Sequence, residues 1–298
     1  MSSNCYIAID IGGTAIKYGI VNPIGNVLKN AEIPTNAKDG ADTVIHRIID
    51  HIHPFCSVYK PSGIAISTAG QVDIEKGTIT HAGETLPGYK NYPIKEIFEK
   101  AFNLPVSVDN DVNCALLGEK WLGTAKNETE CIMLTIGTGI GGAILLDGNL
   151  YRGRHFAAGE WGYMWLRERS FEQLASTSAL INQVETALDL KAGSLNGKKI
   201  FELMDCNQSV VEITNQFFTN LAKGIANIIF ILDIKKVIVG GGISENKYFL
   251  KYLNRYLTEY LPGEIQNRVI LESASLGNKA GFIGAVFHHL NTYKKQEF

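Results

Sequence analysis

The fold of this chain is decided by residues 6–18, which read Tyr6-Ile-Ala-Ile-Asp10-Ile-Gly-Gly-Thr-Ala-Ile-Lys17-Tyr18. Isoleucine stands at every second position before the glycine pair, which is the period of a half-buried β-strand. The alternation resumes from Ile16, so a second strand follows. Because glycine tolerates positive φ, Gly12 and Gly13 predict a two-residue hairpin turn between the strands.

The tip of this hairpin carries groups suited to binding a phosphate. Bare backbone amides at a glycine turn form a concavity that attracts anions. Thr14 adds a hydroxyl, Asp10 a carboxylate and Lys17 a cation. An ordinary hairpin would explain the glycines alone, but the three polar side chains favour phosphate binding. A Rossmann fingerprint and a Walker loop are both excluded, because each leads into a helix and here a strand follows.

The same design recurs in the middle of the chain. An apolar strand ends at Gly137, a turn reads Thr138-Gly-Ile-Gly-Gly142, and another apolar strand leads to Asp147. Strand, glycine turn and strand therefore occur twice, about one domain length apart. This predicts two lobes built on one plan, each presenting a glycine turn to a shared cleft.

Composition excludes several classes of protein. The net charge of −2 over 298 residues gives no basic footprint, so we expect no nucleic-acid partner. No apolar run is long enough to cross a membrane, and the N-terminus lacks a positively charged leader, which predicts a cytoplasmic protein without a membrane partner. The five cysteines are odd in number and dispersed, as expected of reduced thiols rather than of a disulfide framework or metal site.

Five blocks resemble, in order, the signature blocks of the ROK family of sugar kinases and repressors. They are Asp10-Ile-Gly-Gly-Thr-Ala-Ile-Lys17, Asn110-Asp-Val-Asn-Cys-Ala-Leu-Leu-Gly-Glu119, Leu134-Thr-Ile-Gly-Thr-Gly-Ile-Gly-Gly142, Ala158-Gly-Glu160 and Val239-Gly-Gly-Gly-Ile-Ser244. The resemblance implies an α/β protein with the two-lobed actin-like (ribonuclease-H-like) ATPase fold, each lobe a mixed sheet flanked by helices. It implies a small lobe of residues 1–112 plus about 281–298, a large lobe of residues 113–280, and a homodimer.

The resemblance also implies roles for Asn110 and Asp111, which open a predicted helix. Asp is a favoured N-cap, and a carboxylate at a helix N-terminus stays ionised. In the family, the residue at Asp111 is the catalytic base and the residue at Asn110 contacts the sugar. Asp109 is expected to be a turn residue. Gly70 follows a buried strand, and we expect it near the sugar, because ligands of open α/β sheets gather at strand ends.

ATP and Mg²⁺ are the expected co-substrate and cofactor. The residues expected to hold the phosphates are Gly12, Gly13, Thr14, Gly137, Thr138 and Gly139. Asp10 would orient Mg²⁺ through water, since this ion dehydrates reluctantly. Gly241 and Gly242 would lie against the adenosine, or else allow close strand–helix packing. Lys17 either reaches the nucleotide or is structural.

The sugar side shows a departure from the family. Glu160 matches the family's sugar-binding glutamate, but Tyr163 stands where the family has a histidine that also ligates a structural zinc. The zinc-binding cysteines are missing, since residues 167–180 contain none. We therefore expect no zinc. Glu172 is either a second sugar-binding glutamate or a solvated surface residue.

These features predict a kinase that transfers the γ-phosphate of ATP to the 6-hydroxyl of a glucose unit. The zinc-free segment resembles the family's β-glucoside kinases, and Trp161 and Tyr163 offer aromatic faces to a sugar such as cellobiose. The alternatives are a glucokinase or N-acetylmannosamine kinase, and beyond these a non-catalytic sugar sensor or repressor. A repressor would carry a DNA-binding module ahead of Tyr6, where we expect too few residues for one.

Overall fold

The computed structural model describes residues 4–83, 86–246 and 248–294, and the chain divides into two compact units. The first unit comprises Met1–Asn127, Arg152–Ala157 and Leu276–Phe298. The second unit comprises Glu128–Tyr151 and Ala158–Ser275. Each unit contains its own mixed sheet, as the sequence predicted.

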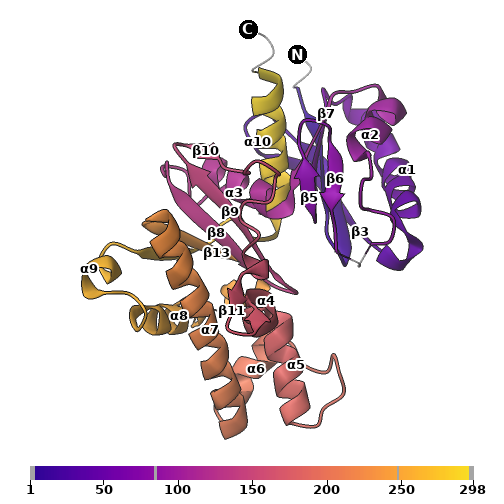
Figure 1. The fold of residues 1–298 in the computed structure, drawn as a ribbon. Helices are drawn as coiled ribbons and strands as arrows, with labels where there is room; N and C mark the ends of the chain where they lie inside the picture. Colours follow the sequence, from indigo (N-terminus) through magenta and orange to yellow (C-terminus); the bar gives the residue numbers. More distant parts are fainter. Residues whose placement is uncertain (1–3, 84–85, 247, 295–298) are drawn as a thin grey trace. The chain divides into compact units, whose positions relative to one another are not determined.

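The first unit is built on a five-stranded sheet (Figure 1). In spatial order its strands are β3 (Val27–Pro34), β2 (Ala15–Val21), β1 (Tyr6–Ile11), β4 (Ile64–Thr68) and β7 (Val106–Asn110). The hairpin strands β1 to β3 are antiparallel, whereas β4 and β7 run parallel to β1. A small antiparallel pair, β5 (Gln71–Asp73) and β6 (Thr78–His81), follows β4.

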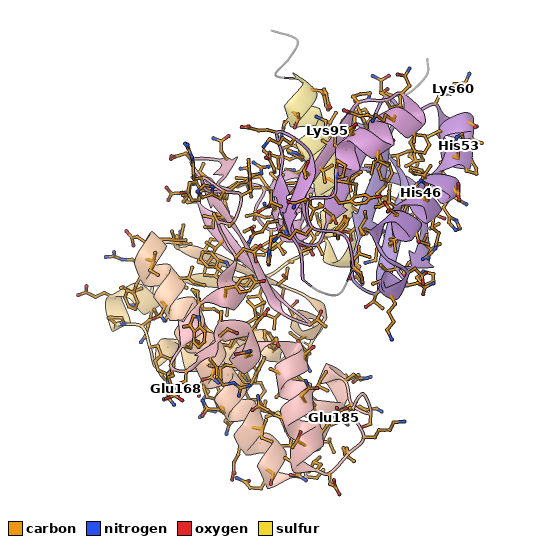
Figure 2. The ribbon with its side chains drawn as sticks, turned by 45° about the vertical axis from the view of Figure 1, so that its right-hand side comes forward. His46, His53, Lys60, Lys95, Glu168 and Glu185 are labelled. Carbon is orange, nitrogen blue, oxygen red and sulfur yellow. The ribbon has the colours of Figure 1, made fainter. Side chains whose placement is uncertain are left out.

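Helices cover both faces of this sheet. Side chains alternate between the two faces along each strand, and apolar side chains on both faces are buried. Ile7 and Ile9 of β1 belong to the core under α1 (Ala41–Tyr59) and α2 (Ile94–Phe102). Ala8 faces the opposite side and packs with α10 (Ala280–Lys294). In Figure 1 α10 lies to the left of the sheet and α1 to the right. His46 and His53 are exposed on α1 (Figure 2).

Glycines allow α10 to pack closely on α3 (Asp111–Leu122). A β-carbon on Gly284 would lie 1.7 Å from the Cys114 carbonyl oxygen, and one on Gly118 would lie 2.4 Å from the Ala280 carbonyl oxygen. No larger residue fits either position. This contact holds α3 to α10 within the first compact unit, which extends to Asn127. Two 3₁₀ turns complete the unit, η1 (Ala37–Asp39) and η4 (Gly277–Lys279).

The second unit repeats the strand plan of the first. In spatial order its strands are β10 (Asn149–Leu150), β9 (Ile140–Leu146), β8 (Cys131–Ile136), β13 (Lys236–Gly240) and β14 (Ile270–Ser273). Again a hairpin of antiparallel strands is extended on one side by two parallel strands. The repetition expected from the two glycine turns is therefore present.

The core of the second unit forms where its sheet packs on a long helix. Leu134 of β8 and Leu221 of α7 (Gln208–Leu232) belong to one apolar cluster. The Phe171 ring is buried against Gly224 of the same helix, where a β-carbon would lie 2.3 Å from the ring. The remaining elements are η2 (Trp161–Tyr163), β11 (Trp165–Leu166), β12 (Arg169–Ser170), α4 (Phe171–Ala175), α5 (Thr177–Ala187), α6 (Gly197–Leu203), η3 (Gly242–Glu245), α8 (Phe249–Thr258) and α9 (Gly263–Gln266).

Across the described ranges of both units, no helix combines the length and apolarity needed to cross a bilayer.

Candidate active site

The first glycine turn is wider than the sequence predicted. Ile11 pairs with Ile16, so four residues form the loop, and the Gly12 amide donates to the Ala15 carbonyl at 3.1 Å. Neither Gly12 nor Gly13 has a positive φ, so the prediction of a two-residue turn was wrong. The backbone of Gly13 borders open space instead, because a β-carbon there would meet no atom of the described residues within 4 Å. Gly13 and Thr14 are exposed, which leaves the backbone open to an anion.

Asp10 lies beside this loop in a narrow polar niche. The Ser67 hydroxyl donates to its Oδ1 at 2.6 Å, and Lys17 lies directly opposite it on β2. Burial raises the pKa of the Asp10 carboxyl, and the Ser67 hydrogen bond and the Lys17 charge act against this rise. A β-carbon on Gly281 would lie 3.1 Å from Oδ1, so α10 also approaches the carboxylate closely. Lys17 thus has an electrostatic role at Asp10, whereas its contact with a nucleotide stays a prediction.

The turn from β7 into α3 is capped by Asn110 rather than by Asp111. The Asn110 Oδ1 accepts from the Val112 amide at 2.9 Å and from the Asn113 amide at 3.1 Å. Its Nδ2 donates to the Gly70 carbonyl at 2.9 Å, so the structure brings Asn110 and Gly70 together. This leaves the second Nδ2 hydrogen as the one with which Asn110 can reach a sugar.

Asp111 is the first residue of α3 and is half-buried. Its Oδ1 accepts from the Val112 amide at 2.9 Å, and the helix N-terminus favours the ionised carboxylate. The Tyr89 hydroxyl lies 2.6 Å from Thr68 Oγ1. Burial raises the pKa of Tyr89, and the charge of Asp111 adds to the rise, so Tyr89 is a neutral phenol near the carboxylate. Sequence reasoning missed Tyr89, because only the folded chain brings residue 89 to this turn.

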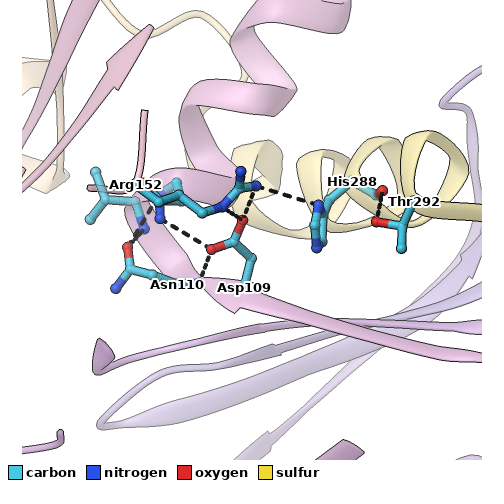
Figure 3. Close-up of polar contacts among 7 residues, drawn as sticks. Asp109, Asn110, Arg152, His288 and Thr292 are labelled. Atoms are coloured by element: carbon cyan, nitrogen blue, oxygen red, sulfur yellow. Dashed lines mark hydrogen bonds and ion pairs between the residues drawn. The ribbon is translucent and has the colours of Figure 1, made fainter. Parts of the chain in front are cut away.

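Asp109 is not a turn residue, as had been expected, but the centre of a buried network (Figure 3). Only 1% of it is exposed. Its Oδ2 accepts from Nε and Nη2 of Arg152 at 2.9 and 2.5 Å, and its Oδ1 accepts from the Asn110 amide at 2.8 Å and from Asn113 Nδ2 at 3.1 Å. Burial is the largest influence on Asp109 and acts to raise its pKa, but the Arg152 charge, the neighbouring His288 and the hydrogen bonds from Arg152 and Asn113 together outweigh it, and the net pKa is lowered.

His288 of α10 completes this network. Its Nδ1 lies 3.5 Å from Arg152 Nη2, and Thr292 Oγ1 donates to its carbonyl at 2.9 Å (Figure 3). Burial lowers the pKa of His288; the Asp109 carboxylate acts against this and the Arg152 charge adds to it, and the net pKa is lowered, which favours the neutral imidazole. Arg152 and His288 carry no motif, and no sequence signal could have identified them.

The second glycine loop opens onto a pocket of about 760 Å³ within the second unit. Its lining includes three of the predicted ATP residues, Gly137, Thr138 and Gly242. A β-carbon on Gly137 or Gly242 would meet no atom of the described residues within 4 Å, so both present bare backbone to the pocket. Gly241 is required for a different reason: its φ is +92°, and a β-carbon there would lie 2.3 Å from the Ile136 carbonyl oxygen.

The rest of the pocket lining fits a nucleotide. Apolar side chains suited to a flat base and polar side chains suited to ribose and phosphate both contribute, and the volume is in the usual range for ligand pockets. The further lining residues are Ile136, Thr177, Ser178, Ile181, Asn196, Gly197, Lys198, Phe201, Ile243, Asn246 and Tyr248. Asn196 and Lys198 carry no motif, so the sequence did not single them out.

The three predicted sugar residues of the second unit lie near one another. Burial raises the pKa of Glu160, and the charge of Glu172 raises it further. Burial, then Glu160 and Glu172, raise the pKa of Tyr163. The Glu172 Oε2 lies 2.6 Å from the position of a β-carbon on Gly139 and 2.9 Å from that of one on Gly162. Glu172 is therefore half-buried against the second glycine loop, and its contact with a sugar stays a prediction.

Trp161 does not offer the open aromatic face expected of it. Its ring packs on β9, where a β-carbon on Gly142 would lie 1.8 Å from Cδ1. Its Nε1 is buried and has no hydrogen-bond partner among the described residues. Within those residues no group of three or more His, Cys, Asp or Glu side chains is arranged to hold a metal ion. The absence of zinc stays a prediction, since it concerns the purified protein.

Comparison with known proteins gives consistent matches over nearly the full length. The ROK family matches residues 6–290. The β-glucoside kinase of Klebsiella pneumoniae is 35% identical over 301 residues, covering 97% of each protein. A Listeria monocytogenes protein proposed to be an N-acetylmannosamine kinase has a TM-score of 0.90 at 31% identity, covering 97% of this chain and 99% of that one.

A third relative carries both ligands of the expected reaction. A ROK family glucokinase from Streptomyces griseus, solved in complex with glucose and AMPPNP, has a TM-score of 0.81 at 27% identity, over 96% of this chain and 99% of that one. The two repeated mixed sheets and these structural likenesses confirm the actin-like ATPase fold. With the family match extending from Tyr6 to Leu290, the chain belongs to the ROK family.

Proposed function

We propose that this protein is an ATP-dependent sugar kinase that phosphorylates the 6-hydroxyl of a glucose unit, with a β-glucoside such as cellobiose as the favoured substrate. The observation that carries the proposal is the pocket of the second unit, where the bare backbone of Gly137 and Gly242 and the Thr138 hydroxyl meet an apolar wall. Relatives that are β-glucoside kinases and glucokinases support sugar as the acceptor.

In the proposed reaction the two glycine loops bind the phosphates of ATP. The amides of Gly12 and Gly13 and the Thr14 hydroxyl would act in the first loop, and Gly137 to Gly139 in the second. Asp10 would hold Mg²⁺ through water, and its niche beside Ser67 and Lys17 suits an indirect contact. When bound, Mg²⁺ neutralises the charge that develops on the transferring phosphoryl group.

Asp111 would take the proton from the attacking sugar hydroxyl. The Asn110 cap fixes the start of α3, so the Asp111 carboxylate is held at a helix N-terminus where it remains ionised. A carboxylate of this kind can accept a proton as the hydroxyl oxygen approaches the γ-phosphorus in line. Asn110 would orient the sugar, and Glu160 and Glu172 would accept hydrogen bonds from its hydroxyls.

The preference for a β-glucoside rests on Tyr163 and on the cysteine-free residues 167–180, where the structure has the β11–β12 hairpin and α4. The 35% identity to a β-glucoside kinase supports it. A monosaccharide kinase acting on glucose or N-acetylmannosamine is the second candidate, favoured by the structural likeness to proteins described with those activities.

A panel of sugars tests both the kinase assignment and the preference for a β-glucoside. ATP-dependent phosphorylation is measured with cellobiose, gentiobiose, an aryl β-glucoside, glucose and N-acetylmannosamine, and kcat/KM is compared across them. We expect a β-glucoside to give the highest value. A clear preference for a monosaccharide would overturn the β-glucoside assignment alone, whereas no phosphorylation of any sugar would overturn the kinase assignment.

The homodimer expected from the family resemblance also stays a proposal. Light scattering of the purified protein measures its mass in solution. A mass of about twice the 32.7 kDa of one chain would support it, and the mass of a single chain would contradict it.

A further inference from the structure

Residues 163–166 alternate between the core and the solvent. Met164 and Leu166 pack against the apolar core of the second unit. Tyr163 and Trp165 point away from it and are 55% and 71% exposed. Two large aromatic side chains therefore face away from this core, Tyr163 at the end of η2 and Trp165 at the start of β11. Such exposure is unusual for tryptophan, which is highly buried on average.

This segment is tied down rather than loose. Trp165 pairs with Ser170 across the β11–β12 hairpin, and the Phe171 amide donates to the Met164 carbonyl at 2.6 Å. Ser170 then caps α4 in a capping box with Gln173, in which each side chain bonds the other residue's backbone amide. The backbone that carries Trp165 is thus fixed on both strands, so its indole is presented from a defined position.

Two carboxylates adjoin the exposed aromatics. The charges of Glu160 and Glu172 both act on the Tyr163 hydroxyl, so all three polar groups lie within electrostatic reach of one another. Trp165 stands two residues beyond Tyr163, and the backbone of Met164 between them is extended, so the two Cα atoms are about 7 Å apart. Two exposed aromatic side chains therefore lie next to the candidate sugar residues, on backbone positions separated by roughly the width of one sugar ring.

Sugar rings are recognised by this combination of groups. Carboxylates accept hydrogen bonds from hydroxyls, while the apolar face of a pyranose or an aryl ring covers an aromatic side chain and removes both from water. Trp161 cannot serve in this way, because its ring is already covered by β9. Trp165 is the tryptophan of the second unit whose ring is open to solvent.

We propose that Trp165, together with Tyr163, forms the subsite for the second ring of a β-glucoside, that is, the sugar or aryl group attached to C1 of the glucose that is phosphorylated. This inference rests on the proposed kinase function and gives its substrate preference a structural basis. It makes Trp165 a specificity residue, which contacts the part of the substrate that free glucose lacks.

Trp165→Ala tests the subsite by its selectivity. We expect KM for cellobiose to rise about fivefold to tenfold, as for the loss of one aromatic stacking contact. KM and kcat for glucose should stay within about twofold of the wild-type values, because glucose does not reach the subsite. Trp165→Phe, which keeps an aromatic face, should retain most of the cellobiose affinity.

The matched control is Tyr151→Ala, which removes a 51% exposed aromatic residue of the same unit outside the 160–172 segment. This variant should keep the wild-type KM and kcat for both cellobiose and glucose. Equal effects of Trp165→Ala on cellobiose and glucose, or no effect on cellobiose, would overturn the subsite while leaving the kinase proposal intact.

Calorimetric titration without ATP separates the subsite from the chemistry. We expect wild-type protein to bind cellobiose more tightly than Trp165→Ala does, and the two proteins to bind glucose alike. If the wild type binds cellobiose in this Trp165-dependent way but phosphorylates no sugar, the subsite stands and the proposed function fails. If Trp165→Ala binds cellobiose as well as the wild type does, the subsite is wrong whatever the kinase activity.

Discussion

At the scale of single residues, the start of α3 divides its tasks between neighbours. Asn110 caps the helix, Asp109 anchors the turn through Arg152, and Asp111 contributes a hydrogen bond from the Val112 amide, which already bonds the Asn110 cap. A substitution of Asp111 can therefore change the chemistry with little change to the helix start.

Asp111→Asn should lower kcat at least ~10²-fold, because an amide keeps the shape of the carboxylate but cannot accept the proton. KM for ATP should stay close to the wild-type value. Steady-state kinetics measures kcat and KM, and thermal melting checks that the variant is folded. The control is Glu96→Gln, which changes an exposed residue in the first turn of α2. Near-normal kcat in a folded Asp111→Asn protein would remove Asp111 as the base.

Arg152→Ala should destabilise the protein by about 3–5 kcal/mol at pH 7, because it leaves the buried Asp109 carboxylate without its cation. Arg152→Lys keeps the charge and should recover part of the loss. Arg154→Ala, two residues along and exposed, should leave the free energy of unfolding unchanged. Urea unfolding of the three variants measures these differences.

The loss of unfolding free energy caused by Arg152→Ala should also depend on pH. In the wild type the pKa of Asp109 is lowered, so its stabilising contribution is present above the unfolded value of 3.8 and is lost only as pH falls through the still lower folded value. Without Arg152, burial favours the protonated acid. The stability difference between wild type and Arg152→Ala should therefore shrink as pH falls toward 4, and a constant difference would contradict the buried ion pair.

At the scale of elements, His289 fixes α10 to the first sheet. Its Nδ1 lies 3.0 Å from Ser107 Oγ, and a β-carbon on Gly63 would lie 2.3 Å from its Nε2, so the ring fills the space between helix and strands. Burial lowers the pKa of His289 to about 4 from the usual 6.5, and the neighbouring His288 adds to this. The folded protein therefore holds the neutral imidazole.

The free energy of unfolding should consequently fall by about 3 kcal/mol as pH drops from 6.5 to 4, since the unfolded chain binds the proton first. His289→Gln should flatten this part of the pH profile. His46→Gln, an exposed histidine on α1, should leave it unchanged (Figure 2). An unaltered slope in His289→Gln would show that other groups set the pH dependence.

A second interaction at this scale joins the end of α5 to the loop that follows it. The buried Glu185 accepts from the backbone amides of Gly193 at 3.0 Å and Leu195 at 2.8 Å. These hydrogen bonds lower the pKa of Glu185 and hold the loop that leads into Asn196 and Lys198, two residues of the nucleotide pocket. Figure 2 labels Glu185 beside this loop. We therefore propose Glu185 as a positioning residue for nucleotide binding.

Glu185→Gln should raise KM for ATP about threefold to tenfold, the loss of one charge-assisted hydrogen bond, with KM for the sugar unchanged. The split between the two KM values distinguishes loop positioning from general destabilisation, which would affect both. Glu168→Gln, exposed on the β11–β12 turn, is the matched control. Equal changes in both KM values would count against the role of this loop.

At the scale of the whole molecule, metal content tests the zinc-free interpretation. Tyr163 and the cysteine-free residues 167–180 predict far less than one zinc per chain in protein purified without added metal. Elemental analysis measures this content, and a chelator should leave the Tm unchanged. Stoichiometric zinc, lost together with the fold on chelation, would contradict it.

Much of the fold could be predicted because its signals are local. The alternation before Gly12 and the apolar run before Gly137 depend only on neighbouring residues, and both produced the expected hairpins. The start of α3 was located for the same reason. The turn geometry at Gly12 could not be predicted. Glycine occurs both where φ is positive and where the backbone leaves room for a ligand, and the sequence does not distinguish these two cases.

The sequence by itself determined the two hairpins, their glycine loops and the start of α3, since each is encoded by residues a few positions apart. Only the tertiary structure decided that Asp109 is paired with Arg152, 43 residues away, and that Trp165 rather than Trp161 is open to solvent. The physical reason is that burial and ion pairing depend on which distant segments meet. Hydrophobic periodicity identifies a face, but not the partner that covers it.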